Sequence, residues 1–318
     1  MNIAVEYKDA TGTITNQTHR LTRLAFAKHL AIAGQGYAPR LQKLIRTVAM
    51  FFHYSSYIQR QAFYNDRFSE PPIQLSDPTE KGQFSNLAGK AIADFLSKRI
   101  NQSIYTVNYE AAMRIHNPPI PLFVNGRQVR RPDLLAYTAN SRFAIEAKGF
   151  SGGFGNMNDH KNQSQTGGIR VNFTVASVSY DLYNKVKCKY HDPSNDNVPY
   201  DNELLRRLTK EYYGGLSEFL NEKFFNIRVT EIQGEKFYEV ELSYRPFEKL
   251  FPDEFPFRHF WHFEILDYYR PRIILPFAIR DYAENGITNE IKPFIFETKE
   301  QDYNTYIDND RIGLRIRR

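Results

Sequence analysis

The sequence has a single cysteine, Cys188, and no long run of apolar residues. One cysteine excludes an internal disulfide bond and a zinc site made of several thiolates. No stretch is long enough to span a bilayer, and the chain does not begin with a cationic segment followed by an apolar one. We therefore expect a cytoplasmic protein with no membrane partner. Cys188 alternates with Val186 and Tyr190, a spacing that favours a buried thiol on a strand.

A strong excess of either charge sign is also missing. The chain carries 42 lysines and arginines against 36 acidic residues, for a net charge of +6, and its pI is about 9.1. This mild basicity favours a polyanionic partner such as nucleic acid, but many basic proteins bind nothing acidic. Aromatic residues make up 15% of the sequence, which argues against disorder and for one large or two smaller globular domains.

The chain is organised around a predicted β-hairpin in residues 130–149. Two short apolar runs, LLAY and FAIEA, flank a polar turn centred on residues 140–141. Side chains alternate along a strand, so Glu146 and Lys148 point to the same face. Closure of the hairpin brings Asp133 opposite that end of the second strand. We therefore expect two carboxylates and an ammonium group to converge on one patch.

Such a patch has an electrostatic cost that suggests its chemistry. Two ionised carboxylates ~4 Å apart repel each other by about 4 kcal/mol at an effective dielectric constant near 20. Either one of them takes up a proton or a cation sits between them. A hard divalent ion such as magnesium suits oxygen ligands of this kind and keeps other positions for water and phosphate. The alternative is a surface hairpin in which Lys148 merely pairs with Glu146 or Asp133.

The residues of this hairpin also carry a resemblance. Pro132-Asp133, followed after a spacer by Glu146-Ala147-Lys148, resembles the signature of the PD-(D/E)xK nuclease superfamily. The resemblance implies a restriction-endonuclease-like fold and metal-dependent hydrolysis of phosphodiester bonds, in DNA rather than RNA, in restriction, repair or anti-phage defence. It implies that Asp133 and Glu146 bind Mg²⁺ or Mn²⁺, with the Ala147 carbonyl as a further ligand. Lys148 would position the nucleophile and stabilise developing charge.

The resemblance covers residues 77–190 and includes a predicted helix ahead of the hairpin. The sequence DPTE at residues 77–80 is typical of a helix start, with Glu80 as a capping acid. Many members of the superfamily carry a glutamate on this helix, but the matching positions here are Ser85 or Asn86. Asn86 is an assisting candidate that reaches a metal-bound water. The missing acid supports a second hypothesis, a catalytically decayed nuclease fold that serves as a nucleic-acid-binding or assembly subunit, with itself or with a partner protein.

A second predicted helix follows the hairpin, after a glycine-rich loop at residues 149–155. The loop lacks the pattern of a phosphate-binding P-loop. Two interpretations of it remain, a flap over the substrate and a plain surface loop. Members of the superfamily often carry a lysine or glutamine on this helix, so Lys161, Gln163 and Gln165 are assisting candidates by resemblance. His160 is either a general base or ordinary polar surface.

Three arginines precede Asp133 at the rim of the predicted site: Arg127, Arg130 and Arg131. Guanidinium groups match phosphate oxygens well, which predicts nucleic-acid contacts for all three. For Arg131, a structural ion pair with Asp133 is an equal alternative.

Turn signals divide the chain into three parts. We expect a helical N-terminal subdomain at 1–70, a nuclease-like α/β core of mixed sheet flanked by helices at 76–193, and a C-terminal α/β region at 200–318 that binds nucleic acid or forms oligomers. The further expected elements are helices at 21–33, 39–65 and 202–222, strands at 103–116, 170–183 and 185–190, a linker at 191–202 and a hairpin formed by 226–232 and 236–244.

The segment 246–272 is unusually aromatic. Its His259, His262 and Glu264 do not follow a regular ligand spacing, which favours an aromatic core strand over a metal site. Its arginines and the basic C-terminal tail also suit a surface that stacks bases and holds phosphates.

Overall fold

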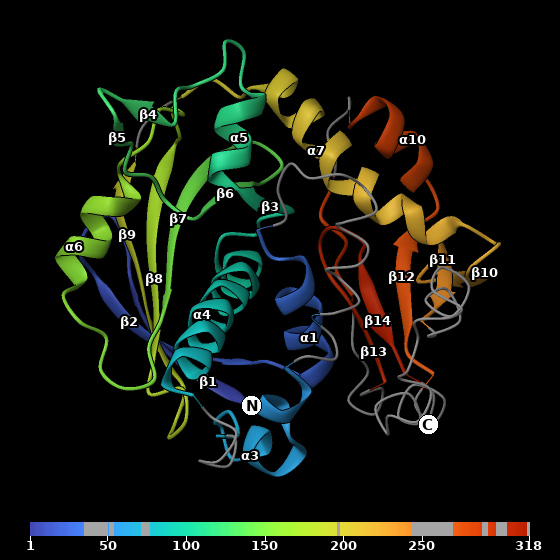
Figure 1. Cartoon of the computed structure of the whole chain (residues 1–318), viewed down its shortest axis with the longest axis horizontal. Helices are drawn as coiled ribbons and strands as arrows, with labels where there is room; N and C mark the ends of the chain where they lie inside the picture. Colours follow the sequence, from blue (N-terminus) through green and yellow to red (C-terminus); the bar gives the residue numbers. More distant parts are fainter. Residues whose placement is uncertain are drawn as a thin grey trace.

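The computed structural model describes residues 1–34, 50, 54–70, 77–195, 198–242, 270–287, 292–296 and 304–316. Within these residues the chain is a mixed α/β protein, built on one mixed seven-stranded sheet flanked by helices and one antiparallel five-stranded sheet (Figure 1). The predicted α/β class and mixed sheet are therefore confirmed.

The predicted hairpin lies inside the larger sheet. In this sheet two pairs of neighbouring strands are parallel, β1 with β9 and β7 with β8, and the other pairs of neighbouring strands are antiparallel. Because β1 is paired along its length with β9, the start of the chain belongs to the same sheet as the hairpin. The strand order is β2 (Ile14–Arg20), β1 (Asn2–Lys8), β9 (Lys187–Asn195), β8 (Phe173–Tyr180), β7 (Arg142–Gly149), β6 (Leu134–Tyr137) and β3 (Tyr105–Asn108).

One face of this sheet is covered by α1 (Arg23–Ile32) and α4 (Pro78–Ile100). The helix start predicted at residue 77 is confirmed: Asp77 Oδ1 accepts a hydrogen bond from the Thr79 amide at 2.8 Å, and Pro78 lies in the first turn. The apolar stripe of α4 packs against the buried side chains of β6 and β7. The opposite face is covered by α5 (Tyr109–Ile115), α6 (Met157–Ser164) and α7 (Asn202–Ser217).

The prediction of a strand over 103–116 is wrong beyond residue 108. The strand β3 ends at Asn108, whose side chain accepts a hydrogen bond from the Ala111 amide at 3.1 Å and so begins α5. Such a side-chain cap satisfies one of the free amides of the first helical turn. The linker predicted at 191–202 is also partly wrong, because β9 continues to Asn195. Cys188 lies on β9 and is buried, as predicted.

Much of the helix predicted at 39–65 lies outside the described residues, which omit residues 39–49 and 51–53. The described remainder holds the short 3-10 helix η1 (Ser55–Ile58) and α3 (Arg60–Tyr64) instead of one continuous helix. Tyr57 of η1 stacks on Phe84 of α4, with ring centroids 4.0 Å apart. This aromatic contact holds η1 and α4 together.

The five-stranded sheet is formed by the C-terminal part of the chain. Its predicted hairpin is confirmed, and the turn at Gln233 (φ 52°) and Gly234 (φ 80°) has the two positive φ angles of a type I′ turn. Residues 243–269, with His259, His262 and Glu264, lie outside the described part. The strand order is β10 (Asn226–Ile232), β11 (Glu235–Glu241), β12 (Arg272–Pro276), β14 (Gly313–Arg315) and β13 (Thr305–Ile307), with η2 (Glu218–Leu220) and α10 (Ile279–Asn285) beside α7.

Two arginines of the C-terminal region have defined partners. Arg272 and Arg315 both contact the buried carboxylate of Glu239, which Arg228 also contacts. These guanidinium groups therefore neutralise a buried charge within the second sheet.

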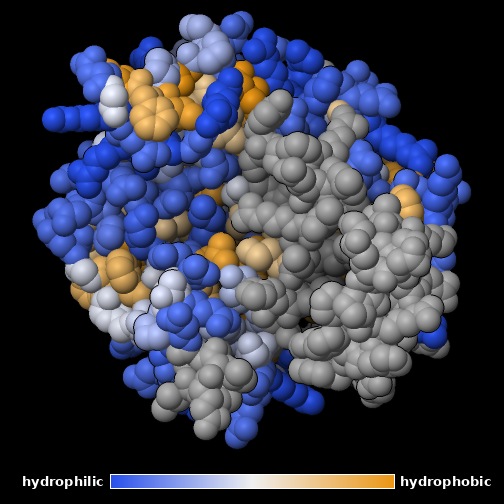
Figure 2. Space-filling view, in the orientation of Figure 1, coloured by the Kyte–Doolittle hydropathy of each residue, from blue (hydrophilic) through white to orange (hydrophobic). Residues whose placement is uncertain are grey.

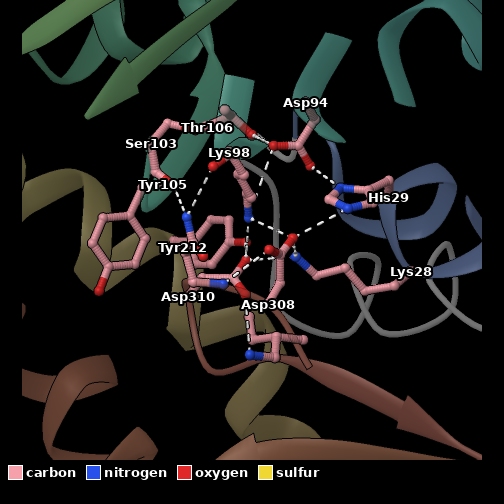
Figure 3. Close-up of polar contacts among 12 residues, drawn as sticks. Lys28, His29, Asp94, Lys98, Ser103, Tyr105, Thr106, Tyr212, Asp308 and Asp310 are labelled. Carbon is pink, nitrogen blue, oxygen red and sulfur yellow. Dashed lines mark hydrogen bonds and ion pairs between the residues drawn. The ribbon is translucent and has the colours of Figure 1, made fainter. Parts of the chain in front are cut away.

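The two sheets are joined by a buried ionic cluster (Figure 3). Lys98 of α4 contacts Asp310 at 2.8 Å and Asp308 at 3.3 Å, and both aspartates lie in the turn between β13 and β14. On α1, Lys28 lies 2.8 Å from the same Asp310. The cluster comprises Lys28, His29, Asp94, Lys98, Asp308 and Asp310, and all six side chains are at most 1% exposed.

The electrostatics of the cluster favour its charged form. Burial opposes ionisation of Asp308, but Lys28 and Lys98 outweigh it and hold the pKa of Asp308 well below its usual value. Burial likewise opposes ionisation of Asp94, whose pKa is nevertheless lowered by Lys98 and His29. Removal of one partner from such a buried group leaves the remaining charges uncompensated.

We predict that Asp308→Asn lowers the free energy of unfolding at neutral pH by about 3–5 kcal/mol, the usual effect of breaking a buried ion pair. The pKa of Asp308 is lower in the folded chain than in the unfolded chain. Its contribution is therefore present above the unfolded pKa and is lost as the pH falls below it toward the folded pKa. Urea unfolding between pH 3 and pH 7 measures both effects.

The control is Glu284→Gln, at an exposed position of α10. It is expected to change the unfolding free energy by less than about 0.5 kcal/mol. Equal stability of Asp308→Asn and wild type across this pH range would contradict the prediction.

Candidate functional site

The hairpin β6–β7 forms where the sequence predicts it, but its turn is centred on residues 139–140, one residue earlier than predicted. Leu134 pairs with Ile145 and Tyr137 pairs with Arg142, so Asp133 stands opposite Glu146. The Asp133 amide donates a hydrogen bond to the Ile145 carbonyl at 3.0 Å, which extends the strand pairing to this residue.

The structure brings the three predicted site residues together. Lys148 Nζ lies 2.6 Å from Glu146 Oε1 and 3.3 Å from Asp133 Oδ2. The amide of Ala147 also donates to Asp133 Oδ2, at 3.1 Å. Glu146 is fully buried, whereas the side chains of Asp133 and Lys148 are 27% and 29% exposed. Asp133 and Lys148 are therefore partly accessible from solvent, with Glu146 buried behind them.

Burial of Glu146 gives this site unusual proton chemistry. Burial first, and then the negative charge of Asp133, raise the pKa of Glu146 to about 8, although Lys148 acts in the opposite direction. Burial acts to lower the pKa of Lys148, but Asp133 and Glu146 raise it above its usual value. Neither carboxylate oxygen of Glu146 has a hydrogen bond, since the close contact with Lys148 lacks hydrogen-bond geometry.

Both oxygens lack a hydrogen bond, although Oε1 is ion-paired with Lys148, and carboxylate oxygens of this kind suit a hard cation, which requires oxygen ligands. The residues able to hold it are Asp133, Glu146 and the Ala147 carbonyl. Across the described part of the chain, no group of three or more His, Cys, Asp and Glu side chains gathers as a metal site would require. The side-chain ligand set is thus limited to two carboxylates.

A lysine of α4, missed in the sequence, also reaches the site. Lys90 Nζ lies 3.8 Å from Asp133 Oδ1. One turn earlier, Asn86 is exposed, and Ser85 is buried with its hydroxyl donating to the Lys81 carbonyl at 2.7 Å. The α4 side chain that the structure places beside Asp133 is therefore a cation. The signal was present in the sequence, because Lys90 follows Asn86 by four residues and so lies on the same side of the helix as this candidate.

Two glycines set the distance between α4 and the hairpin. A Cβ atom on Gly89 would lie 2.4 Å from the Gly149 amide nitrogen and from the Lys148 carbonyl carbon. A Cβ atom on Gly149 would lie 1.9 Å from the Ser85 carbonyl oxygen. The helix backbone thus touches the strand backbone directly beside Lys148, which only glycine permits. This contact fixes the end of β7 that carries Lys148.

The assisting candidates on α6 are dispersed. Gln163 Nε2 donates to the Arg131 carbonyl at 3.2 Å, two residues ahead of Asp133. Gln165 is exposed at the end of the helix, and Lys161 lies among charges of β1 and β9. The pKa of His160 is lowered by burial and by the charge of Lys148. Of the four, Gln163 and His160 lie toward the site.

The rim arginines differ from one another. Arg131 forms an ion pair with Glu110 of α5. Arg127 and Arg130 are exposed, on and beside the small hairpin of β4 (Phe123–Val124) and β5 (Arg127–Gln128). This hairpin lies at the upper left of Figure 1, where Figure 2 shows a hydrophobic patch. Arg127 and Arg130 are thus the two rim arginines that are exposed to solvent.

Comparison of the chain with protein-family models, curated proteins and solved structures gave no match. Among the helices that the structure describes, none has the length and apolar character needed to cross a membrane.

We predict opposite effects for two alanine substitutions on α4. Gly89→Ala is expected to lower the free energy of unfolding by about 1–3 kcal/mol, because its methyl group forces α4 away from β7. Gly82 lies on the same helix with nothing within 4 Å of a Cβ atom. Gly82→Ala is therefore expected to be neutral or to stabilise by up to about 1 kcal/mol. Chemical unfolding of both variants measures the difference, and a Gly89→Ala protein as stable as Gly82→Ala would refute the close contact.

Proposed function

We propose that this chain is a cytoplasmic, metal-dependent nuclease with a restriction-endonuclease-like core that hydrolyses phosphodiester bonds in DNA. One observation carries the proposal: Asp133, Glu146 and Lys148 meet at the ends of two central strands, with both Glu146 oxygens buried and lacking hydrogen bonds. This arrangement fits the PD-(D/E)xK pattern that the sequence resembles. Restriction or anti-phage defence is the proposed setting.

The donor set fits Mg²⁺ or Mn²⁺ held by Asp133, Glu146 and the Ala147 carbonyl. When bound, such an ion supplies an activated water and neutralises charge on the phosphate. The protein contributes the fixed positions of the two carboxylates, since one is held by β6–β7 pairing and the other is fully buried.

Lys148 is the group of the chain proposed to touch the reacting phosphate. Its ammonium is partly exposed, keeps its charge because two carboxylates raise its pKa, and has three donors. It orients the nucleophile and stabilises the charge that develops on phosphate oxygens. Lys90 of α4, beside Asp133, adds a second positive charge to the site. Arg127 and Arg130 are proposed to hold the flanking DNA.

A second candidate function is a catalytically decayed subunit that binds nucleic acid or assembles with another protein or a second copy. Lys90 favours it, because two lysines already balance the charges of Asp133 and Glu146 without a metal. Metal binding separates the two candidates, since a decayed subunit has no need for a metal site that Asp133→Ala abolishes.

The cleavage prediction concerns Lys148→Ala. We expect wild type to cut plasmid, linear or single-stranded DNA with magnesium or manganese but not with EDTA, and the variant to be at least about 100-fold slower. Lys210→Ala, at an exposed position of α7, is the control and is expected to cut like wild type. Undiminished cutting by Lys148→Ala would place the active site elsewhere. No cutting by wild type on any of these substrates would favour the decayed subunit.

The metal-binding prediction uses the pKa of Glu146. Only the ionised carboxylate binds the ion, and the pKa of about 8 means that Glu146 is largely protonated at pH 6–7. The affinity for Mn²⁺ is therefore expected to rise by up to about tenfold per pH unit below pH 8 and to level off above it. Calorimetric titration of wild type and Glu146→Gln measures this. A pH-independent affinity in wild type would contradict the role of Glu146.

A further inference from the structure

The sheet face that carries the candidate site continues from β7 onto three further strands. Lys148 of β7 pairs with Val178 of β8, Val178 pairs with Lys189 of β9, and Lys189 pairs with Glu6 of β1. Residues paired in this way form one row across a sheet and point to the same face. Strands lie about 4.8 Å apart, so Lys189 stands roughly 10 Å from Lys148 along this row.

Cations gather around Glu6 at the far end of the row. Lys189 Nζ lies 2.9 Å from Glu6 Oε1, and His191 Nε2 lies 2.9 Å from the same oxygen. Lys8 follows Glu6 by two residues on β1 and so points to the same face. Lys161 reaches the group from α6. We call Lys8, Lys161, Lys189 and His191, with Glu6, the Glu6 cluster.

Positive charge is in excess within the Glu6 cluster. Burial lowers the pKa of Lys161, and the like charges of Lys8 and Lys189 lower it further against the single opposing effect of Glu6. In the described part of the chain, no ion pair involves Lys161. The pKa of His191 is lowered by burial and by the charges of Lys161 and Lys189, although Glu6 raises it. The carboxylate of Glu6 is thus the single negative charge of the cluster against three ammonium groups, and the excess positive charge attracts a further anion.

Aromatic rings border the cluster. Lys189 Nζ lies 4.6 Å from the ring centroid of Phe154, in the glycine-rich loop. The ring of Phe154 meets that of Tyr180 edge to face, with centroids 5.0 Å apart. Phe154 is half-buried, and the surface around α6, at the left of Figure 2, is largely hydrophilic. Lysines interleaved with an accessible aromatic ring suit a strand of nucleic acid, whose bases stack and whose phosphates pair with cations.

We propose that the Glu6 cluster binds a backbone phosphate of a single nucleic-acid strand, beside the phosphate at Lys148, and that a base of that strand stacks on Phe154. The assignment of the phosphate at Lys148 rests on the proposed nuclease function. The roughly 10 Å between the two lysines is larger than the rise of about 3.4 Å per nucleotide along the axis of B-form DNA, so the two phosphates belong to different nucleotides of one strand. Because Val178, between the two lysines in this row, is fully buried, the strand would pass along the glycine-rich loop rather than over β8.

The test is binding of a fluorescein-labelled single-stranded oligonucleotide, followed by fluorescence anisotropy in EDTA so that no cleavage occurs. Lys189→Gln is expected to bind about threefold to tenfold more weakly, the effect of losing one ordinary polar contact. Its plot of log affinity against log salt should be shallower by about 0.7, the value for one phosphate contact on a single strand. Glu6→Gln removes the competing carboxylate and is expected to bind more tightly than wild type.

Two variants complete the experiment. Lys210→Gln makes the same charge change at an exposed position of α7 and is expected to bind like wild type. Phe154→Ala is expected to weaken binding without changing the salt dependence, because stacking releases no counterions.

Opposite signs for Lys189→Gln and Glu6→Gln distinguish a phosphate site from a structural ion pair, for which both variants lose stability and neither gains affinity. Weakening by Lys210→Gln equal to that of Lys189→Gln would overturn the inference, and so would a wild type that does not bind the oligonucleotide at low salt. Binding as expected without cleavage by wild type in magnesium would overturn the nuclease function and leave the Glu6 cluster as a nucleic-acid site.

Discussion

Lys98 and Lys28 contact two aspartates from the far end of the chain, and these buried ion pairs tie α4 and α1 to the second sheet. Charges in such an environment are stable only when every partner is in place. The same helix α4 is pressed against β7 at Gly89 and Gly149, where no side chain separates the two backbones. The position of Lys148 therefore depends on a helix that is held from both sides.

The candidate site therefore has one buried side, which is held by packing, and one side that is accessible from solvent. Glu146 is buried without hydrogen bonds and keeps a raised pKa, while Asp133 and Lys148 face solvent beside Lys90. A buried ionisable group with a strongly shifted pKa is typical of functional sites. The row that leads from Lys148 through the buried Val178 to Lys189 places the Glu6 cluster on the same face of the sheet as the candidate site.

Much of the candidate site was predictable from local sequence. The alternation in β6 and β7 and the polar turn between them predict the hairpin. A turn centred on residues 140–141 would set Asp133 opposite Lys148, whereas the observed register sets it opposite Glu146. The start of α4 was predictable from its capping residues. The strand prediction for residues 103–116 was wrong beyond residue 108, because the side chain of Asn108 caps a helix that begins inside this segment.

The sequence by itself determined the hairpin, the motif residues and the start of α4, because strand period, turn chemistry and helix capping act over a few neighbouring residues. Only the tertiary structure decided that Lys28, a polar break in the pattern of α1, meets Asp310, and that Lys90 reaches Asp133. It also decided that β1 lies parallel to β9 and so gathers Lys8, Lys161 and Lys189 around Glu6. These contacts join residues far apart in the chain, and burial and charge pairing select them only once the sheets have packed.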